Sequence, residues 1–331
     1  MRALHDPIRR SDLPVSPVVS IGNFDGVHLG HREILEETVR RAAVLGVPAS
    51  VITFDPHPLR ILMPERAPKM LLTLGQKEEQ FASLGIDDLL VIPFTRDFSL
   101  TAAPDFIRAF LVEALHVREV VIGRGFYFGH ARSGDLALLT SLGKEFGFLA
   151  HGVPDVSWKG APISSTRIRR ALAAGSVADA NSMLGRPFSI EGFVARGARV
   201  GRSLGFPTLN IHPEGELWPG DGVYVTRTEL RSSFQTFDSV TNVGTRPTLY
   251  ENSATSVESF VLDFSQDVYG EEVRLYFLER IRDERKFDSV EELAEQISLD
   301  VEFARGWFRR NPCGPGGSLA QSEPDGEREA R

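Results

Sequence analysis

Residues 17–31 read PVVSIGNFDGVHLGH, and this stretch decides the fold of the first half of the chain. The apolar run Pro17–Ile21 predicts a buried strand, and a glycine-rich turn follows it directly. Apolar residues at helical spacing continue from His31 to Leu45, and Gly46 ends the helix because glycine readily adopts the left-handed conformation. A strand, a glycine-rich turn and a helix start in direct succession are typical of anion-binding sites in α/β proteins.

Strands and helices continue to alternate beyond this stretch. We expect strands over 49–54, 89–93 and 119–122 and helices over 76–84, 105–115, 164–174 and 176–185. Ser164 or Ser165 can cap the third of these helices, and Ser176 with Asp179 fits the pattern of a capping box for the fourth. The alternation predicts a parallel sheet with helices on both faces, in which ligands bind at the carboxyl ends of the strands.

The sequence pattern changes after Gly185-Arg186-Pro187, where glycine and proline favour a domain boundary. Short segments rich in β-branched and aromatic residues follow over 188–196, 222–231, 236–242, 256–264 and 272–277. Turn sequences separate these segments, so we expect a small antiparallel barrel or sandwich.

A predicted helix closes this second region. Ser289 and Glu292 fit a capping box, and the expected core face consists of Val290, Leu293, Ile297, Val301, Ala304 and Phe308. From Asn311 the chain is rich in glycine, proline, serine and charged residues, which predicts a disordered tail. We therefore expect domains at residues 1–185 and 186–310 and a tail at 311–331.

The composition limits the classes of function. A length of 331 residues favours two domains at about 100–200 residues each, and 25% charged residues is ordinary for a soluble globular protein. The net charge of -8 gives no general attraction to nucleic acid, although a local basic pocket can still bind a small anion. No apolar run reaches about 18 residues, no signal-peptide pattern is present, and Cys313 is the single cysteine. We expect a cytoplasmic chain without a nucleic-acid or membrane partner, and its oligomeric state stays open.

His28 and His31 are the first candidate catalytic residues. They lie three positions apart at the expected helix start, so they share one helix face. The helix N-terminus adds backbone N–H donors and the positive end of the helix dipole. Alone, such a pair could equally be surface or core histidines. With the strand, the glycines and the helix start in place, the pattern indicates stabilisation of charge on a phosphate.

Residues 163–169, ISSTRIR, form a second candidate. Their hydroxyls can cap a helix or contact phosphate oxygens, and an arginine can neutralise a phosphate with its planar guanidinium. A serine cap followed by arginines is common in proteins of every function. Its combination with the histidine motif favours the phosphate-binding interpretation.

HxGH followed much later by ISSTxxR resembles the signature pair of the nucleotidylyltransferases. The longer stretches GNFDGVHLGH (22–31), TFDPHP (53–58) and FGHARSGD (128–135) resemble the bacterial bifunctional riboflavin kinase/FMN adenylyltransferases. The second half adds GRSLGFPTLN (201–210), NVGTRPT (242–248) and VESFVLDF (257–264), which resemble the kinase motifs of the same family. The resemblance implies a Rossmann-like nucleotidylyltransferase domain followed by a riboflavin kinase β-barrel with a terminal helix.

The resemblance also implies two reactions: ATP phosphorylates riboflavin to FMN, and a second ATP adenylylates FMN to FAD with release of pyrophosphate. For the second reaction, His28 and His31 would contact the ATP phosphates. The other implied ATP-binding residues of the first half are Gly22, Phe24, Gly26, Gly30, Ser165, Thr166 and Arg169. The implied flavin-binding residues are Phe54, Asp55, Pro56, His57, Pro58, Phe126 and Phe128. His57 could equally be a structural histidine between two prolines.

In the kinase half, the resemblance makes Glu258 the base that accepts the proton of the riboflavin hydroxyl, a role that suits a carboxylate within reach of it. Thr208 and Asn210 would bind Mg²⁺, which prefers oxygen ligands and keeps several waters. Gly201, Arg202 and Gly205 would approach the ATP phosphates. Mg²⁺ with ATP is the expected cofactor, and the flavins are substrates and products.

Two positions depart from the family pattern. Gly125 stands where the family has an aspartate or asparagine before the Phe126-Tyr127-Phe128 stretch, so that polar side chain is missing. Leu209 replaces a smaller alanine between Thr208 and Asn210. Gly125 leaves an alternative open, a riboflavin kinase whose first domain is weak or acts on another nucleotide. A flavin-binding protein without catalysis and a nucleotidylyltransferase of a non-flavin substrate are further alternatives.

Overall fold

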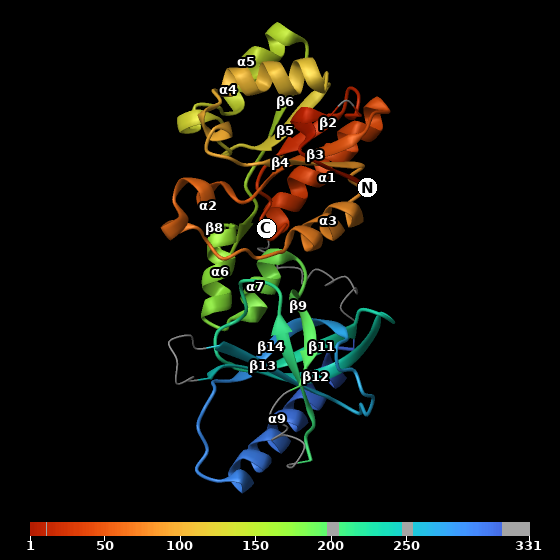
Figure 1. Cartoon of the computed structure of the whole chain (residues 1–331), viewed down its shortest axis with the longest axis vertical. Coiled ribbons are helices and arrows are strands. Elements are labelled where there is room, and N and C mark those ends of the chain that lie inside the picture. The colour runs from red at the N-terminus through yellow and green to blue at the C-terminus, as the bar shows by residue number, and fades with distance from the viewer. Residues whose placement is uncertain (11, 197–204, 247–253, 313–331) are drawn as a thin grey trace, which may run out of the picture. The chain divides into compact units, whose positions relative to one another are not determined.

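The computed structural model describes residues 1–10, 12–196, 205–246 and 254–312. The chain divides into two compact units (Figure 1). Residues 1–168 with 215–217 form the first, and residues 169–214 with 218–331 form the second. The expected disordered tail and the loop residues Gly201 and Arg202 fall outside the described residues, apart from Asn311 and Pro312.

The first unit is built on a six-stranded sheet in the order β1-β4-β3-β2-β5-β6, and all five strand pairs are parallel. The strands are β1 (Arg2–His5), β2 (Val18–Ile21), β3 (Ala49–Asp55), β4 (Asp88–Pro93), β5 (Glu119–Gly123) and β6 (Leu149–Val153). A separate two-stranded antiparallel pair consists of β7 (Ser157–Trp158) and β8 (Ala161–Pro162). The expected parallel sheet is therefore confirmed.

Helices cover both faces of this sheet. They are α1 (Leu29–Leu45), α2 (Pro58–Leu62), α3 (Leu74–Ser83), α4 (Ala103–Phe106), the π-helix η4 (Ile107–Ala114) and α5 (Leu136–Phe146). Short 3₁₀ turns lie at Pro7–Arg9, Pro64–Arg66, Phe98–Leu100 and His130–Arg132. One core packs strand residues such as Ile52 against η4 and α5, and the other packs Val51 against α1 and α3. Neighbouring residues of β3 thus pack into the two cores on opposite faces of the sheet, because side chains alternate along a strand.

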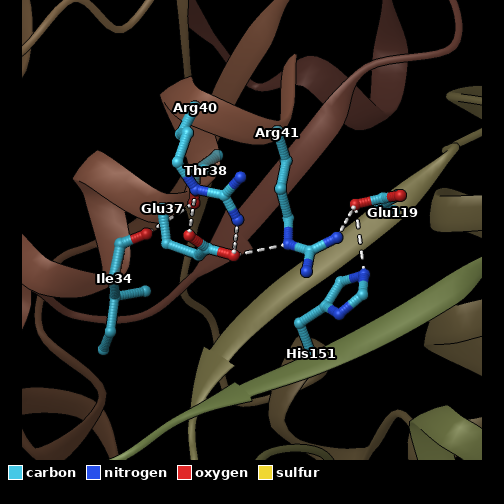
Figure 2. A network of polar contacts seen from close by, with 7 residues as sticks. All are labelled: Ile34, Glu37, Thr38, Arg40, Arg41, Glu119 and His151. Atoms are coloured by element: carbon cyan, nitrogen blue, oxygen red, sulfur yellow. Dashed lines mark hydrogen bonds and ion pairs between the residues drawn. The ribbon is translucent and has the colours of Figure 1, made fainter. Parts of the chain in front are cut away.

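Helix α1 is fixed to the sheet by charged side chains near its C-terminal end (Figure 2). The Arg41 guanidinium donates from Nη1 to Oε2 of Glu119 at 2.9 Å and from Nε to Oε1 of Glu37 at 2.6 Å. Glu119 begins β5 and is only 6% exposed. Nε2 of His151, on β6, lies 3.1 Å from the same Glu119 oxygen. A buried carboxylate needs such partners, because an uncompensated buried charge is costly.

The second unit contains a closed antiparallel barrel in the order β10-β13-β12-β11-β14-β9. The strands are β9 (Phe188–Ala195), β10 (Thr208–Pro213), β11 (Gly222–Leu230), β12 (Gln235–Arg246), β13 (Ala254–Val261) and β14 (Glu272–Arg282). Closure removes the free edges that would otherwise invite pairing with other chains. Of the two folds expected from the sequence, a barrel or a sandwich, the structure has the barrel.

The barrel interior holds a cluster of buried hydroxyls. Thr226 on β11 lies 2.8 Å from the Ser239 hydroxyl and 2.7 Å from the Thr241 hydroxyl, both on β12. Thr228 and Ser259 complete the cluster, and all five residues are fully buried. Each hydroxyl finds a partner among the others, as buried polar groups require.

Helix α9 (Val290–Arg310) packs against the barrel through Val301, Ala304 and Phe308, as expected. Ser289 caps it by accepting from the Glu292 N–H at 3.1 Å. Asp300, only 3% exposed, accepts from the Arg282 guanidinium on β14. Val290 is 57% exposed, so its expected place on the core face is wrong.

Helices α6 (Ser165–Ala173) and α7 (Val177–Leu184) connect the two sequence halves. Residues 169–185, expected in the first domain, cluster with the barrel. Asn181 explains why: its Nδ2 donates to the Phe277 carbonyl at 2.8 Å, and its Oδ1 accepts from the Phe188 N–H at 2.7 Å. The functional boundary near residue 185 stays a prediction. The capping box at Ser176 is wrong, since Ser176 makes no side-chain capping hydrogen bond.

Candidate active sites

The strand order of the first unit marks one edge of the sheet as a binding site. The chain leaves β2 toward β3 on one side and leaves β5 toward β6 on the other. In open α/β sheets, ligands bind outside the carboxyl ends of the strands where the connections diverge in this way. The loops after β2 and β5 are residues 22–28 and 124–129, which hold His28 of the predicted histidine motif and the predicted flavin residues Phe126 and Phe128.

The loop after β2 is shaped by close packing around Phe24. A Cβ added to Gly22 would meet the Phe24 ring at 3.0 Å, so a larger residue would displace that ring. Gly26 has a φ of 87°, a conformation that glycine adopts without strain. The Phe24 ring packs edge-on against His31 and against Phe81 of α3. The loop therefore has one defined shape at the start of α1.

His28 is the N-cap of α1, and its Nδ1 accepts a hydrogen bond from the His31 N–H at 3.3 Å. In the neutral imidazole, an accepting Nδ1 leaves the ring proton on Nε2. The His28 and His31 rings stack with centroids 3.6 Å apart. The two predicted histidines therefore lie together at a helix N-terminus, where the helix dipole favours negative charge.

Helix α6 brings the second predicted motif to this loop. The Ser165 hydroxyl donates to the Asp25 carbonyl at 2.8 Å. Ser164 accepts from the Arg167 N–H, and the Arg167 guanidinium donates to the carbonyls of β8 and of Trp158. Arg167 is thus occupied in the local fold. Thr166 is exposed, and Arg169 follows Ser165 by four residues and lies on the same helix face.

An aromatic cavity of about 440 Å³ lies at the ends of β3, β4 and β5. Of the predicted flavin residues, Phe54, Pro58, Phe126 and Phe128 line it. The remaining lining includes Phe94, Phe98, Phe106 and Tyr127, together with Asn23 from the histidine loop. The volume and the aromatic walls suit a planar ligand of small-molecule size.

Three predicted flavin residues are absent from this lining: Asp55, Pro56 and His57. Asp55 ends β3, and Pro56 and His57 connect it to α2; the peptide bond between Asp55 and Pro56 is cis. His57 is the N-cap of α2 and accepts from the Leu59 N–H at 3.2 Å. This capping bond supports the structural interpretation of His57.

Two arginines of the cavity lining, Arg96 and Arg132, were not predicted from the sequence. They place positive charge beside the aromatic walls. Arg132 lies within the quoted motif FGHARSGD, so the sequence offered a signal for it. Arg96 follows β4 and belongs to no quoted motif. Gly125 has open space around it and an unstrained φ, so a side chain would fit there.

The barrel aligns its predicted residues in a row across three strands. Asn210 of β10 pairs directly with Glu258 of β13, and Glu258 pairs with Asn242 of β12. Thr208 lies two residues before Asn210 and therefore on the same strand face. Ser256 donates to Oε1 of Glu258 at 3.1 Å. A carboxylate, two hydroxyls and two amides thus share one face, and Asn242 stood in the NVGTRPT motif without being named as a site residue.

A second cavity, of about 470 Å³, adjoins this row and is lined by Thr208, Asn210 and residues 264–269, among others. Leu209 pairs with the fully buried Ser259, so it lies on the opposite strand face from Thr208 and Asn210. Gly205 has a φ of 83°. The predicted ATP-binding residues Gly201 and Arg202 lie outside the described residues.

Comparisons with known proteins match the two halves of the chain separately. A family model described as FAD synthetase matches residues 12–167, and one described as riboflavin kinase matches residues 184–308. The bifunctional riboflavin kinase/FMN adenylyltransferase of Haemophilus influenzae is 38% identical over 88% of this chain and 94% of its own length. That of Listeria monocytogenes is 36% identical over 93% and 98%.

A solved structure from Streptococcus pneumoniae, titled as a macrolide-efflux protein, superposes with a TM-score of 0.85 at 31% identity. It covers 93% of this chain, and this chain covers all of it. In the part of the chain that the structure describes, no helix combines the length and apolar character needed to cross a membrane.

Proposed function

The chain belongs to the bifunctional riboflavin kinase/FMN adenylyltransferase family, and we propose that each of its two units performs one of the two reactions. The enzyme phosphorylates riboflavin to FMN and adenylylates FMN to FAD. The proposal assigns the first reaction to the barrel and the second to the parallel-sheet unit. The observation that carries it is the grouping of the predicted residues, with the histidine loop in one unit and the Asn210–Glu258 pair in the other.

In the adenylylation, a phosphate oxygen of FMN attacks the α-phosphorus of ATP. A new P–O bond forms, the bond from the α-phosphorus to the bridging oxygen breaks, and pyrophosphate leaves with the electron pair. The nucleophile is already an anion, so no general base is needed. Catalysis then rests on orientation of the two phosphates and on stabilisation of the charge on the transferring group.

His28 is suited to that stabilisation. Its Nδ1 is engaged with the His31 N–H, so Nε2 carries the proton and can donate to a phosphate oxygen. The N-terminus of the 17-residue helix α1 adds its dipole at the same point. Ser165 and Thr166 begin α6 beside the loop, and they are the proposed contacts for the far phosphates.

The flavin ring of FMN fits the aromatic cavity lined by Phe54, Phe126 and Phe128. Aromatic side chains bind a flat conjugated ring by stacked or edge-on contact. Arg96 and Arg132 are the proposed partners of the FMN phosphate, since guanidinium groups bind phosphate through paired hydrogen bonds. These roles orient the phosphate nucleophile toward the histidine loop.

In the kinase reaction, the 5′-hydroxyl of riboflavin attacks the γ-phosphorus of ATP and ADP leaves. We assign Glu258 as the acceptor of the hydroxyl proton. Its neighbour Ser256 donates to Oε1, which fixes the orientation of the carboxyl group. Asn210, directly opposite on β10, is placed to hold a second polar group of the reactants close to this carboxylate.

Mg²⁺ fits the donor set of the barrel. Thr208 and Asn210 offer two neutral oxygens on one strand face beside the Glu258 carboxylate. Among the described residues, no group of three or more histidine, cysteine, aspartate or glutamate side chains forms a metal cluster. An ion that keeps most of its waters and binds ATP phosphates needs no such cluster. When bound, Mg²⁺ would neutralise charge on the phosphates, and Thr208 and Asn210 would hold it.

The substrates and products are riboflavin, FMN, FAD and ATP. We place the enzyme in the cytoplasm, since both reactions consume ATP and a chain with one cysteine fits a reducing compartment. The test is a time course with purified full-length chain, riboflavin, ATP and Mg²⁺, followed by chromatography of the flavins. We expect FMN first and FAD later. If riboflavin yields only FMN, and supplied FMN yields no FAD, the assignment of the first unit is refuted.

A further inference from the structure

The hairpin directly before α6 is too short to be stable alone. Its strands β7 and β8 have two residues each, and Lys159 and Gly160 form its turn with φ values of 49° and 73°. The Ile163 N–H closes the base of the hairpin by donating to the Val156 carbonyl at 2.8 Å. An isolated two-stranded hairpin is at best marginally stable in water, so contacts from outside must hold it in place.

Arg167, on the first turn of α6, supplies such contacts. Its Nη1 donates to the carbonyls of Ala161 and Pro162, each at 2.6 Å, and its Nη2 donates to the Trp158 carbonyl at 3.1 Å. Its guanidinium carbon also lies 5.9 Å from the centroid of the Trp158 ring. One planar group thus binds both strands of the hairpin, a task that suits the fixed fork of arginine donors.

The same turn of α6 carries the contact with the histidine loop. The Ser164 hydroxyl accepts from the Arg167 N–H at 3.3 Å, as an N-cap side chain does. The next residue, Ser165, donates from its hydroxyl to the Asp25 carbonyl at 2.8 Å. Asp25 is buried and lies three residues before His28, the N-cap of α1. A shift of the first turn of α6 would therefore change how Ser165 meets the histidine loop.

We propose that Arg167 is a positioning residue for the adenylylation. It holds the hairpin of residues 157–162 to the first turn of α6, and this fixes Ser165 and Thr166 beside the histidine loop. The inference rests on the proposed function of the first unit, in which these two residues contact the far phosphates of ATP. Arg167 makes no phosphate contact in this scheme, because its Nη1 and Nη2 donors bind main-chain carbonyls.

The test compares Arg167→Met and Arg167→Lys in the full-length enzyme. The matched control is Arg170→Met, at an exposed arginine of the same helix, and it should match the wild type. We expect Arg167→Met to lower kcat/KM for ATP in FAD formation by about tenfold to a hundredfold, the order of loss that a misplacement of about 1 Å causes. Arg167→Lys should lie between the two, because an ammonium group lacks the planar fork that reaches both strands.

The kinase reaction of the same variants is an internal control, since it also consumes ATP. Its proposed residues, such as Glu258, belong to the second unit. The kcat and the KM for ATP in riboflavin phosphorylation should therefore stay within about twofold of the wild type, as expected for distant and independent sites. A wild-type kcat/KM for FAD formation in Arg167→Met, or an equal loss in both reactions, would overturn the proposal.

Hydrogen–deuterium exchange distinguishes positioning from a direct contact with phosphate. Without ATP, the amides of residues 156–166 should exchange about tenfold faster in Arg167→Met than in the wild type, while those of α1 and α3 keep their rates. A loss of activity with an unchanged exchange pattern would mean that Arg167 binds phosphate itself, and it overturns the proposal. If Arg167→Met fails to fold, Arg167→Lys is measured in the same way, and wild-type exchange or wild-type kcat/KM in that variant overturns the proposal.

The wild-type chain separates this inference from the proposed function. FAD formation by the wild type together with an unaffected Arg167→Met refutes only the positioning role. A wild type that forms no FAD from supplied FMN refutes the assigned function itself.

Discussion

The two candidate sites present polar groups to ATP in different ways. In the first unit, a loop and a helix N-terminus hold His28, and the site depends on how α1, α3 and α6 are fixed to one another. In the barrel, Asn210, Glu258 and Asn242 lie in register on hydrogen-bonded strands. The barrel site is thus positioned by its strand ladder, whereas the first site needs anchors outside the motif. Substitutions should therefore affect the two units independently and through different mechanisms.

Glu258→Ala is expected to have the largest effect. Removal of the proton acceptor should slow riboflavin phosphorylation by about 10²–10⁴-fold. FAD formation from supplied FMN should stay at the wild-type rate, because the first unit does not contain Glu258. Separate assays with riboflavin and with FMN measure this. Equal loss of both activities in a folded variant would contradict independent sites.

His28→Ala is the reciprocal variant. Loss of one donor to a charged transition state costs about 10²–10³-fold, so FAD formation should fall by that factor. Phosphorylation of riboflavin should be unchanged, which serves as the internal control. His28→Asn is a useful second variant, because asparagine is a good helix N-cap and isolates the imidazole from the capping role.

Arg41→Met probes the anchor of α1 at the end away from His28. It leaves the buried Glu119 carboxylate without its guanidinium partner, which should lower the free energy of unfolding of the first unit by about 3 kcal/mol. Denaturant unfolding measures this change. The control is Arg40→Met, at the exposed arginine directly before Arg41. A stable Arg41→Met would show that the charged anchor contributes little.

The same network makes the first unit sensitive to acid. Burial, with the nearby Arg41 cation, lowers the pKa of His151 below its ordinary value near 6.5, against the opposing effect of Glu119. A histidine with a lowered pKa binds its proton more readily when unfolded, so the native state loses stability as pH falls through and below about 6.5. Thermal unfolding from pH 8 to 5 should show this slope, and His151→Asn should reduce it. An unchanged slope in that variant would assign the effect to other groups.

Thr226→Val in the barrel should have the smallest effect. Valine keeps the shape, and Ser239 and Thr241 retain hydroxyl partners in Thr228 and Ser259. The expected cost is about 1 kcal/mol, with unchanged kinase activity, because the hydroxyls line the interior and not the Glu258 row. Thr226→Ser, which keeps the hydroxyl, is the matched control. A large loss of kinase rate would show that the interior cluster supports the site.

Local signals in the sequence were sufficient for the histidine loop and for most strands. Residues 17–46 contain their own strand, turn glycines and helix end, so their structure follows from short-range preferences. By contrast, β1, α5, β6 and β10 were not predicted. The β10 sequence TLNIHP has a proline at its end and one just before it, and it becomes a strand through pairing with β9 and β13. The helix expected over 105–115 exists, but its π-type hydrogen bonds were not visible in the periodicity.

The site residues show the same limit. His28, Ser165, Thr208, Asn210 and Glu258 stood in motifs and could be named in advance. Asn242 stood in the NVGTRPT motif without being named as a site residue, whereas Arg96 lies in ordinary sequence, and only the tertiary structure brings it to the lining of a cavity. Supporting residues of this kind are defined by their neighbours in space, so a single sequence gives no pattern by which to find them.

The most direct test of independent sites is a mixing experiment with the two inactivated variants. Glu258→Ala alone should leave riboflavin unconverted, and His28→Ala alone should stop at FMN. An equimolar mixture should convert riboflavin to FAD, because FMN released by one chain is adenylylated by the other. Failure of the mixture to form FAD, although Glu258→Ala converts supplied FMN and His28→Ala produces it, would contradict the assignment of one complete reaction to each unit.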